Sequence, residues 1–479
     1  MVRSEVILNN IGKIIVIIGF AMLSTVFIAF YYKEDVFSGL LLVALLTLVT
    51  GIVLGIINKH NYILNYREGF AIVGIGWIVA SIFGSLPYLV STQVLSYADA
   101  FFETVSGFST TGATIFSDVE SLPKSILFWR SLTQWLGGMG IMALFVAIIV
   151  GMGVRANQIF KNEIPGPIAN KISPRIKDTA KFLWLTYVVI SIILFIILYV
   201  LGMDIFDALC HTFSTMATGG FSTKNASMGF YSPAIQWVII LFMFIGGTNF
   251  SLHYLAYKRF SFKGYFENKE FNFYLIIIII ATVLSMVGLA NYYNIGDNIR
   301  NSLFQVVSII TTTGFTTENY VTWSSLNHVI ILSLMFMGAC AGSTSGNIKV
   351  GRYLIMLQRA KIELRYMIHP RALFPQRYGD KVLSDALIIN VLQFFFVYIM
   401  IIIAGTIIMG ALGLDLLTSF TATASCMGNV GPAFGLVGPA NNYAFLPSIG
   451  KYVLAIIMLL GRLEIFPLLI LFMPDYWKK

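Results

Sequence analysis

Charge is scarce in this sequence. Lysine, arginine, aspartate and glutamate make up 11% of the 479 residues, whereas soluble domains carry about 25%. The segments between the apolar stretches are too short to bury a core of their own. The sequence therefore excludes an ordinary soluble domain, and with it a separate soluble catalytic unit.

Cysteine and the common catalytic motifs are almost missing as well. Three cysteines occur, each in an apolar stretch and none at a zinc-ligand spacing from another: Cys210, Cys340 and Cys426. We expect them to be small apolar side chains without disulfide bonds. No H-E-x-x-H, no Walker loop and no convincing serine or cysteine triad occurs. Neither an enzyme nor an organic cofactor is therefore predicted.

Long apolar runs, by contrast, recur from end to end of the chain. A bilayer core is about 30 Å thick, and about 20 helical residues cross it. Ten predicted spans have this length: 11–31, 37–57, 69–91, 126–153, 182–203, 233–256, 272–293, 327–348, 384–412 and 448–473. Together they predict an all-α polytopic membrane protein with ten transmembrane helices.

Lysine and arginine gather in alternate connections between these spans. The three basic connections lie at 155–181, 258–269 and 349–381. The positive-inside rule places them, and with them both termini, in the cytoplasm. The net charge of +9 comes without an aromatic-interleaved basic face, so nucleic-acid binding is not predicted. Membrane lipid headgroups are one expected partner of these charges.

The chain also contains an internal repeat. Four segments align on one glycine: "DAFFETVSGFSTTGAT", "DALCHTFSTMATGGFS", "NSLFQVVSIITTTGFT" and "TSFTATASCMGNVGPA". The aligned glycines are Gly112, Gly220, Gly314 and Gly431, and a serine stands six positions before each, at Ser106, Ser214, Ser308 and Ser425. Thirteen positions before the glycine stand residues of types that cap helices: Asp99, Asp207, Asn301 and Thr418. We therefore predict that each segment starts a short helix at these caps.

Each predicted short helix is too short to cross a bilayer. From the cap to the glycine it has about ten residues, or about 15 Å, which is half of the hydrocarbon thickness. Non-helical backbone at that depth must be buried by protein or line water. We therefore predict four re-entrant pore hairpins in a pseudo-four-fold arrangement. The predicted divisions are 1–66 (two leading transmembrane helices), and 67–154, 155–258, 259–365 and 366–479 (pore repeats 1 to 4).

The four glycine segments predict a filter for a dehydrated cation. Each short helix would point its carboxyl end, with about half a negative charge, at the shared centre. Glycine then permits backbone angles that turn carbonyl oxygens inward. The predicted filter residues are Thr110, Thr111, Gly112, Thr218, Gly219, Gly220, Thr312, Thr313, Gly314, Asn429, Val430 and Gly431. The alternative interpretation is that glycine and threonine only allow close helix packing.

A gate is predicted in "MGACAGSTSGNIKVGR". Residues 338 to 347 are small or polar at mid-membrane, so a continuous helix is not expected there. If this segment loops into the pore beneath the filter, it is a movable obstruction; the alternative is a closely packed kinked helix. The predicted gating residues are Gly338, Gly342, Ser343, Thr344, Ser345, Gly346 and Arg462.

Three residues are polar within apolar surroundings. Arg462, in "LLGRLEIFPLL", is costly in a span unless it faces a cavity or a partner, so it is predicted either to face the pore or to form an ion pair elsewhere. Arg130, beside Trp129, is predicted to be an interfacial anchor. His211 is expected to pack or to hydrogen-bond rather than to transfer protons.

The motifs taken together resemble a known family. "STTGAT", "ATGGFST", "TTTGFTT" and "GNVGPAFG", with "FWRSLTQWLGGMGI" and "GSTSGNIKVGR", are similar to motifs of the Trk/Ktr/HKT superfamily of potassium transporters. The two leading spans and the length favour its TrkH/TrkG branch. Two positions depart from the pattern: Ala339 and Asn347 stand where glycines are usual in the gating loop. The fourth segment, with Asn429, Val430 and Pro432, lacks threonines, so exact four-fold symmetry is not expected.

The resemblance implies potassium uptake across a bacterial inner membrane, with K⁺ as the bound and transported ion. It places an intramembrane gating loop at residues 338–347 and a filter-proximal arginine at Arg462. It also implies a homodimer and a separate cytoplasmic TrkA-like ring that binds nucleotides. That ring is predicted to dock on the stretches 161–181 and 352–381. Two alternatives stay open: a secondary transporter of another solute or cation, and a membrane receptor or scaffold that transports nothing.

Overall fold

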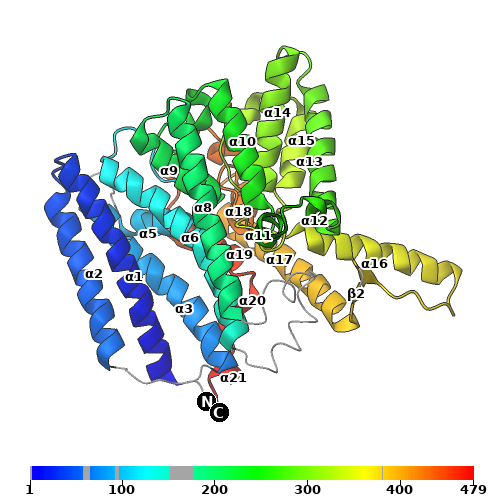
Figure 1. The fold of residues 1–479 in the computed structure, drawn as a ribbon, viewed down its shortest axis with the longest axis horizontal. Helices are drawn as coiled ribbons and strands as arrows, with labels where there is room; N and C mark the ends of the chain where they lie inside the picture. The colour runs from blue at the N-terminus through cyan, green and yellow to red at the C-terminus, as the bar shows by residue number, and fades with distance from the viewer. Residues whose placement is uncertain (1–2, 58–64, 92–95, 152–175, 380, 479) are drawn as a thin grey trace.

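The structure is a bundle of helices with one small two-stranded hairpin (Figure 1). The computed structural model describes residues 3–57, 65–91, 96–151, 176–379 and 381–478. Its longer helices are α1 (Ser4–Tyr31), α2 (Phe37–Ile57), α3 (Tyr66–Gly84), α6 (Lys124–Gly151), α8 (Ile176–Val200), α10 (Pro233–Gly247), α11 (Phe250–Arg259), α13 (Lys269–Gly288), α15 (Ser325–Leu334), α16 (Val350–Ile368), α17 (Asp385–Ala411) and α19 (Ser448–Arg462). The short elements are α4 (Leu86–Val90), α12 (Lys263–Phe266), α20 (Phe466–Leu469), α21 (Pro474–Trp477), the 3-10 turns η1 (Ser227–Phe230), η2 (Tyr320–Thr322), η3 (Gly435–Val437) and η4 (Ile470–Phe472), and the strands β1 (Arg377–Tyr378) and β2 (Lys381–Val382).

A short helix precedes each of the four aligned glycines. These helices are α5 (Tyr97–Phe108), α9 (Ile205–Met216), α14 (Ile295–Ile310) and α18 (Leu416–Gly428). Each begins after a residue whose side chain accepts a backbone N–H of the first turn: Ser96, Asp204, Asn294 and Asp415. Such a cap satisfies one of the free N–H groups at a helix start.

The predicted caps are therefore wrong. Asp99, Asp207 and Thr418 lie in the first turn of their helices, and Asn301 lies in the second. The error arises because residues of capping type occur twice within a few positions. Ser96 and Asp99 bond reciprocally, since the Asp99 N–H donates to the Ser96 hydroxyl and that hydroxyl donates to the Asp99 carboxylate. The helices accordingly have 12 to 16 residues rather than about ten.

Many of the predicted spans correspond to single long helices. Among the described residues, six helices are long and apolar enough to cross a membrane, and up to eight if two bent helix pairs each count as one span. The predicted total of ten therefore stays a prediction. The span predicted at 327–348 is helical only as far as Leu334, where α15 (Ser325–Leu334) ends, and no helix resumes before Val350.

Two predicted spans are sharply bent rather than straight. The axes of α10 and α11 differ by 97°, and those of α19 and the helical segment Phe466–Phe472 (α20 and η4) by 119°. At the first bend Asn249 caps α11 by accepting the N–H of Ser251. At the second bend Glu464 and Ile465 both adopt positive φ angles, 55° and 68°, which a straight helix does not contain.

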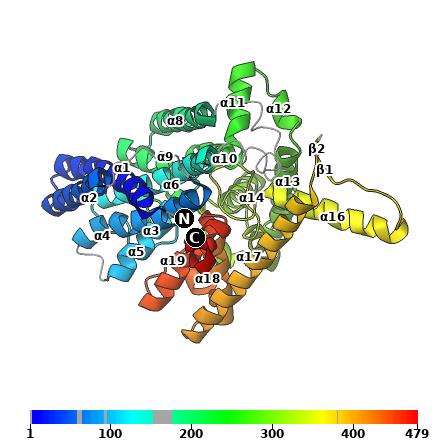
Figure 2. The same ribbon diagram turned by 90° about the horizontal axis from the view of Figure 1, so that it is seen from below.

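The four short helices lie around a common centre (Figure 2). Neighbouring short helices share a packing partner: α6 contacts α5 and α9, α10 contacts α9 and α14, and α19 contacts α18 and α5. The largest buried apolar cluster surrounds them and includes Phe102, Phe304 and Met427. The longer helices therefore link the four short ones in the order α14, α9, α5 and α18.

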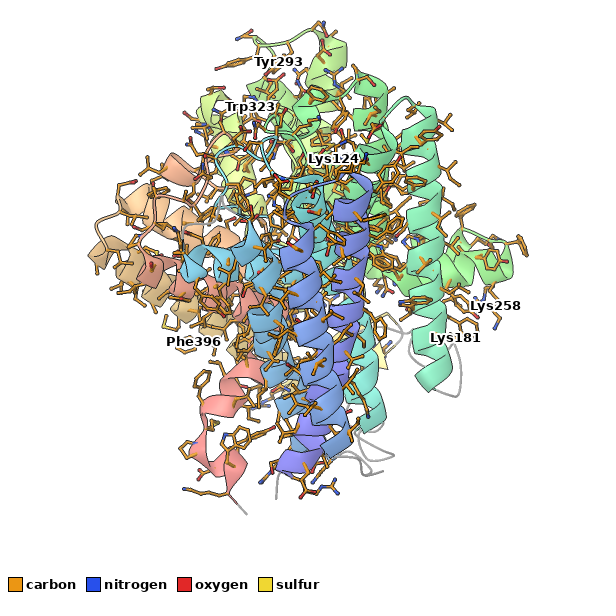
Figure 3. The ribbon with its side chains drawn as sticks, turned by 90° about the vertical axis from the view of Figure 1, so that its left-hand side faces the viewer. Lys124, Lys181, Lys258, Tyr293, Trp323 and Phe396 are labelled. Atoms are coloured by element: carbon orange, nitrogen blue, oxygen red, sulfur yellow. The ribbon has the colours of Figure 1, made fainter. Side chains whose placement is uncertain are left out.

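Both ends of the chain lie at the same end of the bundle (Figure 1). Lys181 and Lys258, from two of the basic connections, lie nearer to that end than Lys124, Tyr293 and Trp323 do (Figure 3). The basic residues predicted between 155 and 175 fall outside the described residues. The cytoplasmic placement of this end stays a prediction.

Candidate functional site

The backbone leaves all four short helices in the same way. The residue before each aligned glycine donates its N–H to the carbonyl of the serine five positions earlier. The four hydrogen bonds are Thr111 to Ser106 (2.9 Å), Gly219 to Ser214 (2.8 Å), Thr313 to Ser308 (2.8 Å) and Val430 to Ser425 (2.9 Å). The shared serine column of the sequence therefore coincides with a shared backbone geometry.

Left-handed backbone angles recur at two positions in each segment. The glycines have φ of 80° (Gly112), 79° (Gly220), 78° (Gly314) and 98° (Gly431). Two positions earlier, residues with a side chain also have positive φ: Thr110 (55°), Thr218 (52°), Thr312 (57°) and Asn429 (56°). Threonine rarely adopts this conformation, which costs on the order of 1–3 kcal/mol. Each segment therefore has two left-handed residues with one residue of another conformation between them.

The four glycine segments meet in a closed ring. A Cβ atom built on Gly112 would lie 2.2 Å from the carbonyl oxygen of Gly219, and one on Gly220 would lie 2.0 Å from that of Thr313. A Cβ on Gly314 would lie 2.1 Å from the oxygen of Val430, and one on Gly431 would lie 2.5 Å from that of Thr111. Each glycine thus faces the carbonyl of the next segment, and the fourth segment returns to the first. All twelve predicted filter residues belong to these four segments.

Side chains support the segments unequally. The Ser308 hydroxyl donates to the carbonyl of Phe315 (2.6 Å), and the Ser425 hydroxyl donates to that of Gly431 (2.8 Å). The hydroxyls of Ser106 and Ser214 have no hydrogen-bond partner among the described residues. In the fourth segment the Asn429 amide donates to the Thr111 hydroxyl (3.0 Å), so an amide there replaces the hydroxyl of the other segments.

Residues 338 to 347 form a loop against this ring. The residues flanking it, Met337 and Ile348, pair as a parallel β-bridge. The N–H of Gly346 donates to the Thr312 hydroxyl (2.8 Å), and the Thr218 hydroxyl donates to that of Thr344 (3.3 Å). A Cβ on Gly346 would lie 2.8 Å from the Asn429 side chain. The loop therefore contacts three of the four segments at the residue where each leaves its helix.

Hydrogen bonds hold the loop from several directions. The Thr344 hydroxyl lies 3.0 Å from the carbonyl oxygen of Met216 and 3.1 Å from that of Gly246. Ser343 and Ser345 pair through their hydroxyls (2.8 Å). Gly342 has φ of 76°, and a Cβ there would meet the side chain of Asn249 at 3.0 Å. Gly338 also lacks room for a side chain, since its Cβ would lie 2.5 Å from the Gly346 oxygen.

Arg462 reaches this loop from the end of α19. It is 1% exposed, and its Nη1 donates to the carbonyl of Thr344 (2.7 Å) while its Nη2 donates to that of Gly137 (3.1 Å). No carboxylate forms a salt bridge with it in the part of the chain that the structure describes; Glu464 pairs with Arg352 instead. The guanidinium is therefore bound by backbone carbonyls beside the ring.

Sequence reasoning missed two charged residues that hold the loop. The charge pattern places Lys349 in the predicted cytoplasmic basic stretch, yet it is 9% exposed and its Nζ donates to the carbonyls of Ser345 and Gly346. Glu270 accepts the N–H groups of Ala341 (2.8 Å) and Gly351 (3.1 Å). The only sequence signal was a charge at the edge of an apolar run.

Arg130 corrects another prediction. It is not an interfacial anchor, because it is 2% exposed and its Nε donates to the Glu103 carboxylate (2.8 Å). The prediction failed because Glu103 lies in a different helix, so sequence proximity gave no hint of the pair. His211 hydrogen-bonds to the carbonyl of Asp207 and to the Ser222 hydroxyl, as expected. The three cysteines are buried and free, as predicted.

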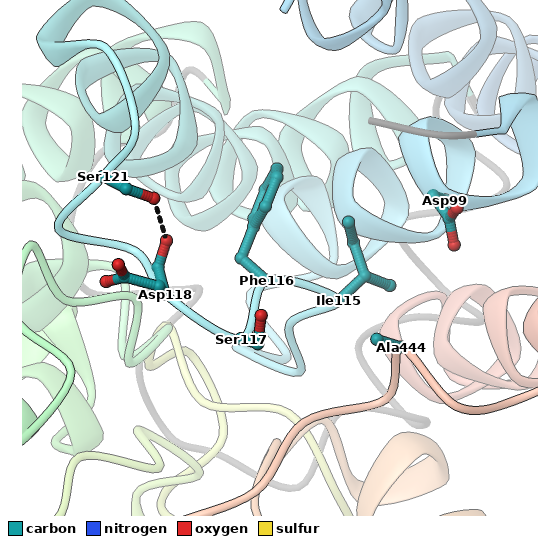
Figure 4. A pocket seen from close by; sticks show the side chains of 7 residues that line it. All are labelled: Asp99, Ile115, Phe116, Ser117, Asp118, Ser121 and Ala444. Carbon is teal, nitrogen blue, oxygen red and sulfur yellow. Dashed lines mark hydrogen bonds between the residues drawn. The ribbon is translucent and has the colours of Figure 1, made fainter. Parts of the chain in front are cut away.

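A pocket lies just outside the first segment (Figure 4). Residues of the first segment's exit, Ile115, Phe116 and Asp118, line it together with Asp99. Lys451 pairs with Asp99 (2.5 Å). The Asn225 amide, which donates to the Asp118 carboxylate (2.7 Å), lowers the pKa of Asp118, so a negative charge persists at this exit down to acidic pH.

Comparison with known proteins identifies the family. The family model TrkH, described as "Cation transport protein", matches residues 41–479. The chain belongs to the TrkH family. It is 37% identical to the Trk system potassium uptake protein TrkH of Salmonella typhimurium over 477 residues, which cover 98% of each chain. It is 34% identical to TrkG of Escherichia coli, with 99% of each chain covered.

A solved structure of this family has the same fold. The crystal structure of the potassium transporter TrkH from Vibrio parahaemolyticus matches with a TM-score of 0.90 at 35% identity, covering 99% of this chain and 100% of that one. The predicted membership of the Trk superfamily, in its TrkH/TrkG branch, is therefore confirmed. As a TrkH-family protein, the chain is a multi-pass helical membrane protein of the cation-transport class.

Proposed function

We propose that this chain mediates potassium uptake across the bacterial inner membrane, through the ring of four glycine segments. Its similarity to Trk potassium uptake proteins over nearly the whole chain supports this. The observation that carries the proposal is the cyclic order of the ring, in which each glycine faces the carbonyl of the next segment. A closed ring of backbone carbonyls replaces the hydration shell of a cation.

Electrostatics favours a cation at the centre of this ring. The four short helices end at the ring, and a helix C-terminus carries about half a negative charge, so the four supply on the order of two. No lysine or arginine belongs to the four segments themselves. Potassium loses its hydration shell more readily than smaller cations, so a preformed ring of oxygens selects it.

The loop at residues 338 to 347 is proposed to be the gate. It meets the segments at Thr218, Thr312 and Asn429, where each helix ends, and so it covers one mouth of the ring. Arg462 adds a positive charge beside the same mouth and binds the loop at Thr344. Permeation would then require the loop to move away from the mouth and the cation to pass the positive charge of Arg462.

Assembly partners are proposed from the family and from the charged surface. The relatives are named as parts of a Trk system, which supports work with other subunits of such a system. The proposed partners are a second copy of this chain and a separate cytoplasmic nucleotide-binding subunit. α16 projects from the bundle (Figure 1) and carries the basic residues Arg359, Lys361 and Arg365. It therefore offers a docking surface for such a subunit.

Growth and flux together test the proposal. A bacterium that lacks its potassium uptake systems should grow at low potassium when it expresses this chain with its cytoplasmic subunit. Proteoliposomes of the purified protein should take up radioactive rubidium. Absence of both effects from a correctly folded protein would reject the proposal.

A secondary transporter of another solute is the remaining candidate. The two bent helix pairs favour it, because broken helices also form substrate sites in such transporters. The alternatives differ in their energy source. Rubidium uptake that needs only its own gradient supports a channel, whereas uptake that requires a proton or sodium gradient supports coupled transport.

A further inference from the structure

The second segment of the ring has a feature that the other three lack. Its residue before the aligned glycine is Gly219, where the others have Thr111, Thr313 and Val430. Glycine has far more backbone freedom than these residues. The carbonyl of this residue is the one that faces the neighbouring glycine. The backbone of the second segment is therefore the least constrained by its own sequence at residue 219, whose carbonyl faces the neighbouring glycine.

Gln134 of α6 fills the space that a side chain at position 219 would need. It is fully buried. Its Nε2 donates to the carbonyl of Gly219 (2.6 Å), and its Oε1 accepts the N–H of Phe221 (3.1 Å). A Cβ on Gly219 would lie 2.4 Å from the Gln134 Cδ. One amide side chain thus holds both sides of Gly220.

Arg130 holds the same segment one helical turn earlier. Residues four apart lie on the same face of a helix, and the Arg130 Nη1 donates to the carbonyl of Ser222 (3.1 Å). Its guanidinium lies over the Phe221 ring, 4.1 Å from the centroid. Two side chains of α6, a helix of the first predicted repeat, therefore make three hydrogen bonds to the second segment between Gly219 and Ser222.

Glu103 connects this arrangement to the first segment. Its carboxylate accepts the Nε of Arg130 (2.8 Å), the N–H of Ile115 (2.9 Å) and the hydroxyl of Thr114 (3.0 Å). Both charges are buried, so the pair pays a desolvation cost that only good geometry and further hydrogen bonds repay. Charged residues at such depth are rarely only structural.

We propose that Glu103, Arg130 and Gln134 are positioning residues for the filter. They hold the second segment in the geometry that threonine or valine gives the other three, and they thereby set the discrimination between potassium and sodium. This inference rests on the proposed function as a potassium-selective pore. It assigns to α6 a role that composition and motif did not suggest.

A compensating pair of substitutions tests the inference. Gln134→Ala should lower the potassium-to-sodium flux ratio in proteoliposomes about two- to ten-fold, as expected for loss of one or two hydrogen bonds. Gly219→Thr alone should impair flux, because its side chain meets Gln134. The double variant Gln134→Ala/Gly219→Thr makes residues 218–221 identical to Thr312–Phe315 and should recover the ratio.

Gln236→Ala is the matched control. Gln236 of α10 is also buried, and its amide donates to the backbone carbonyls of Met228 and Tyr231, outside the ring. This variant should keep the wild-type ratio. The charged pair is tested with Arg130→Met/Glu103→Gln, which leaves no unpaired buried charge and should lower the ratio while potassium flux persists.

A structural measurement separates this inference from the proposed function. In a cryo-electron microscopy map of Gln134→Ala, residues 219–222 should be displaced from their wild-type position, whether or not the protein transports potassium. An unchanged segment would overturn the inference. An unchanged flux ratio in folded Gln134→Ala, or a double variant that recovers nothing, would also overturn it. Absence of potassium flux from the wild type would instead reject the proposed function.

Discussion

At the scale of single residues, the ring depends on its four glycines, which have no Cβ atom. None of its four glycines has room for a Cβ, because each would lie within 2.5 Å of a backbone oxygen of the next segment. Such an approach cannot be relieved by turning a side chain. Each glycine also has a φ of 78° or more, which is unfavourable for residues with a side chain.

Gly314→Ser should therefore abolish or strongly reduce rubidium flux. The new Cβ would lie 2.1 Å from the Val430 oxygen and force the third and fourth segments apart. Gly410→Ser is the control, since Gly410 lies in α17 with no atom within 4 Å of its Cβ position. Rubidium uptake by proteoliposomes measures both variants. Normal flux in a folded Gly314→Ser protein would contradict the ring geometry.

Arg462→Ala should raise resting cation flux. Removal of a nearby positive charge lowers the barrier by about 1–3 kcal/mol, or roughly five- to a hundred-fold in rate. The variant also loses the hydrogen bond to Thr344. Arg462→Lys keeps the positive charge but loses the two-pronged guanidinium that binds the carbonyls of Thr344 and Gly137. It should therefore raise resting flux less than Arg462→Ala does. If Ala and Lys variants both conduct like the wild type, Arg462 has no part in gating.

The sequence indicated which residues form the four segments, but it did not indicate their backbone conformation or the side chains that contact them from other helices. The aligned glycines and serines were visible because they recur at fixed offsets in all four segments. The left-handed φ of Thr110 and its counterparts was not, because threonine rarely adopts it. The partners of Arg130 and Lys349 were also missed, since contacts between different helices leave no local pattern in one sequence.

At the scale of elements, the loop at residues 338 to 347 is the clearest departure from regular structure. It replaces the second half of a predicted span, and its two flanks lie side by side: the N–H of Gly338 donates to the carbonyl of Ile348 (2.8 Å). The loop can therefore be shortened without stretching the chain.

Replacement of residues 339–346 by two glycines should raise resting cation flux. The preference for potassium over sodium should persist, because the four carbonyl segments are untouched. Flux measured in the two ions separates these effects. In this variant the hydrogen bond from Arg462 to the loop is already lost, so Arg462→Ala should raise flux only by removing the positive charge, an effect that salt screens. The two changes together should therefore raise flux by less than the product of their separate effects. A folded variant that conducts no faster would show that this segment is only a packing kink.

The predicted spans show which features of the helices hydropathy can predict and which it cannot. It predicted the apolar segments themselves, because their length and composition are local properties. It did not predict the bends of 97° and 119°, because each bend depends on contacts with other elements. The cap of α11 at Asn249 lies against Gly342 of the loop, and that contact is more than ninety residues away in sequence.

At the scale of the whole molecule, α16 is the element that extends farthest from the bundle (Figure 2). It exposes four large hydrophobic side chains, Leu357, Leu364, Met367 and Ile368, and the basic residues Arg359, Lys361 and Arg365 lie in the same part of the helix. A surface that is both basic and apolar is typical of helices that bind a protein partner or the membrane surface.

Neutralisation of Arg359, Lys361 and Arg365 to glutamine should weaken co-purification with the proposed cytoplasmic nucleotide-binding subunit. The physical reason is loss of charge complementarity across the docking surface. Lys124→Gln is the control, because Lys124 lies farther from the end with the chain termini than Lys181 and Lys258 do (Figure 3); it should leave co-purification unchanged. If the triple variant binds as well as the wild type, the charges serve the lipid headgroups instead.

The central claim is that a cation occupies the ring formed by the four segments. Anomalous diffraction from crystals grown with thallium in place of potassium locates such ions directly. The account predicts anomalous peaks on the axis enclosed by the carbonyl oxygens of Thr111, Gly219, Thr313 and Val430, and their loss when sodium replaces thallium. Ordered thallium elsewhere in the protein, with none in this ring, would contradict it.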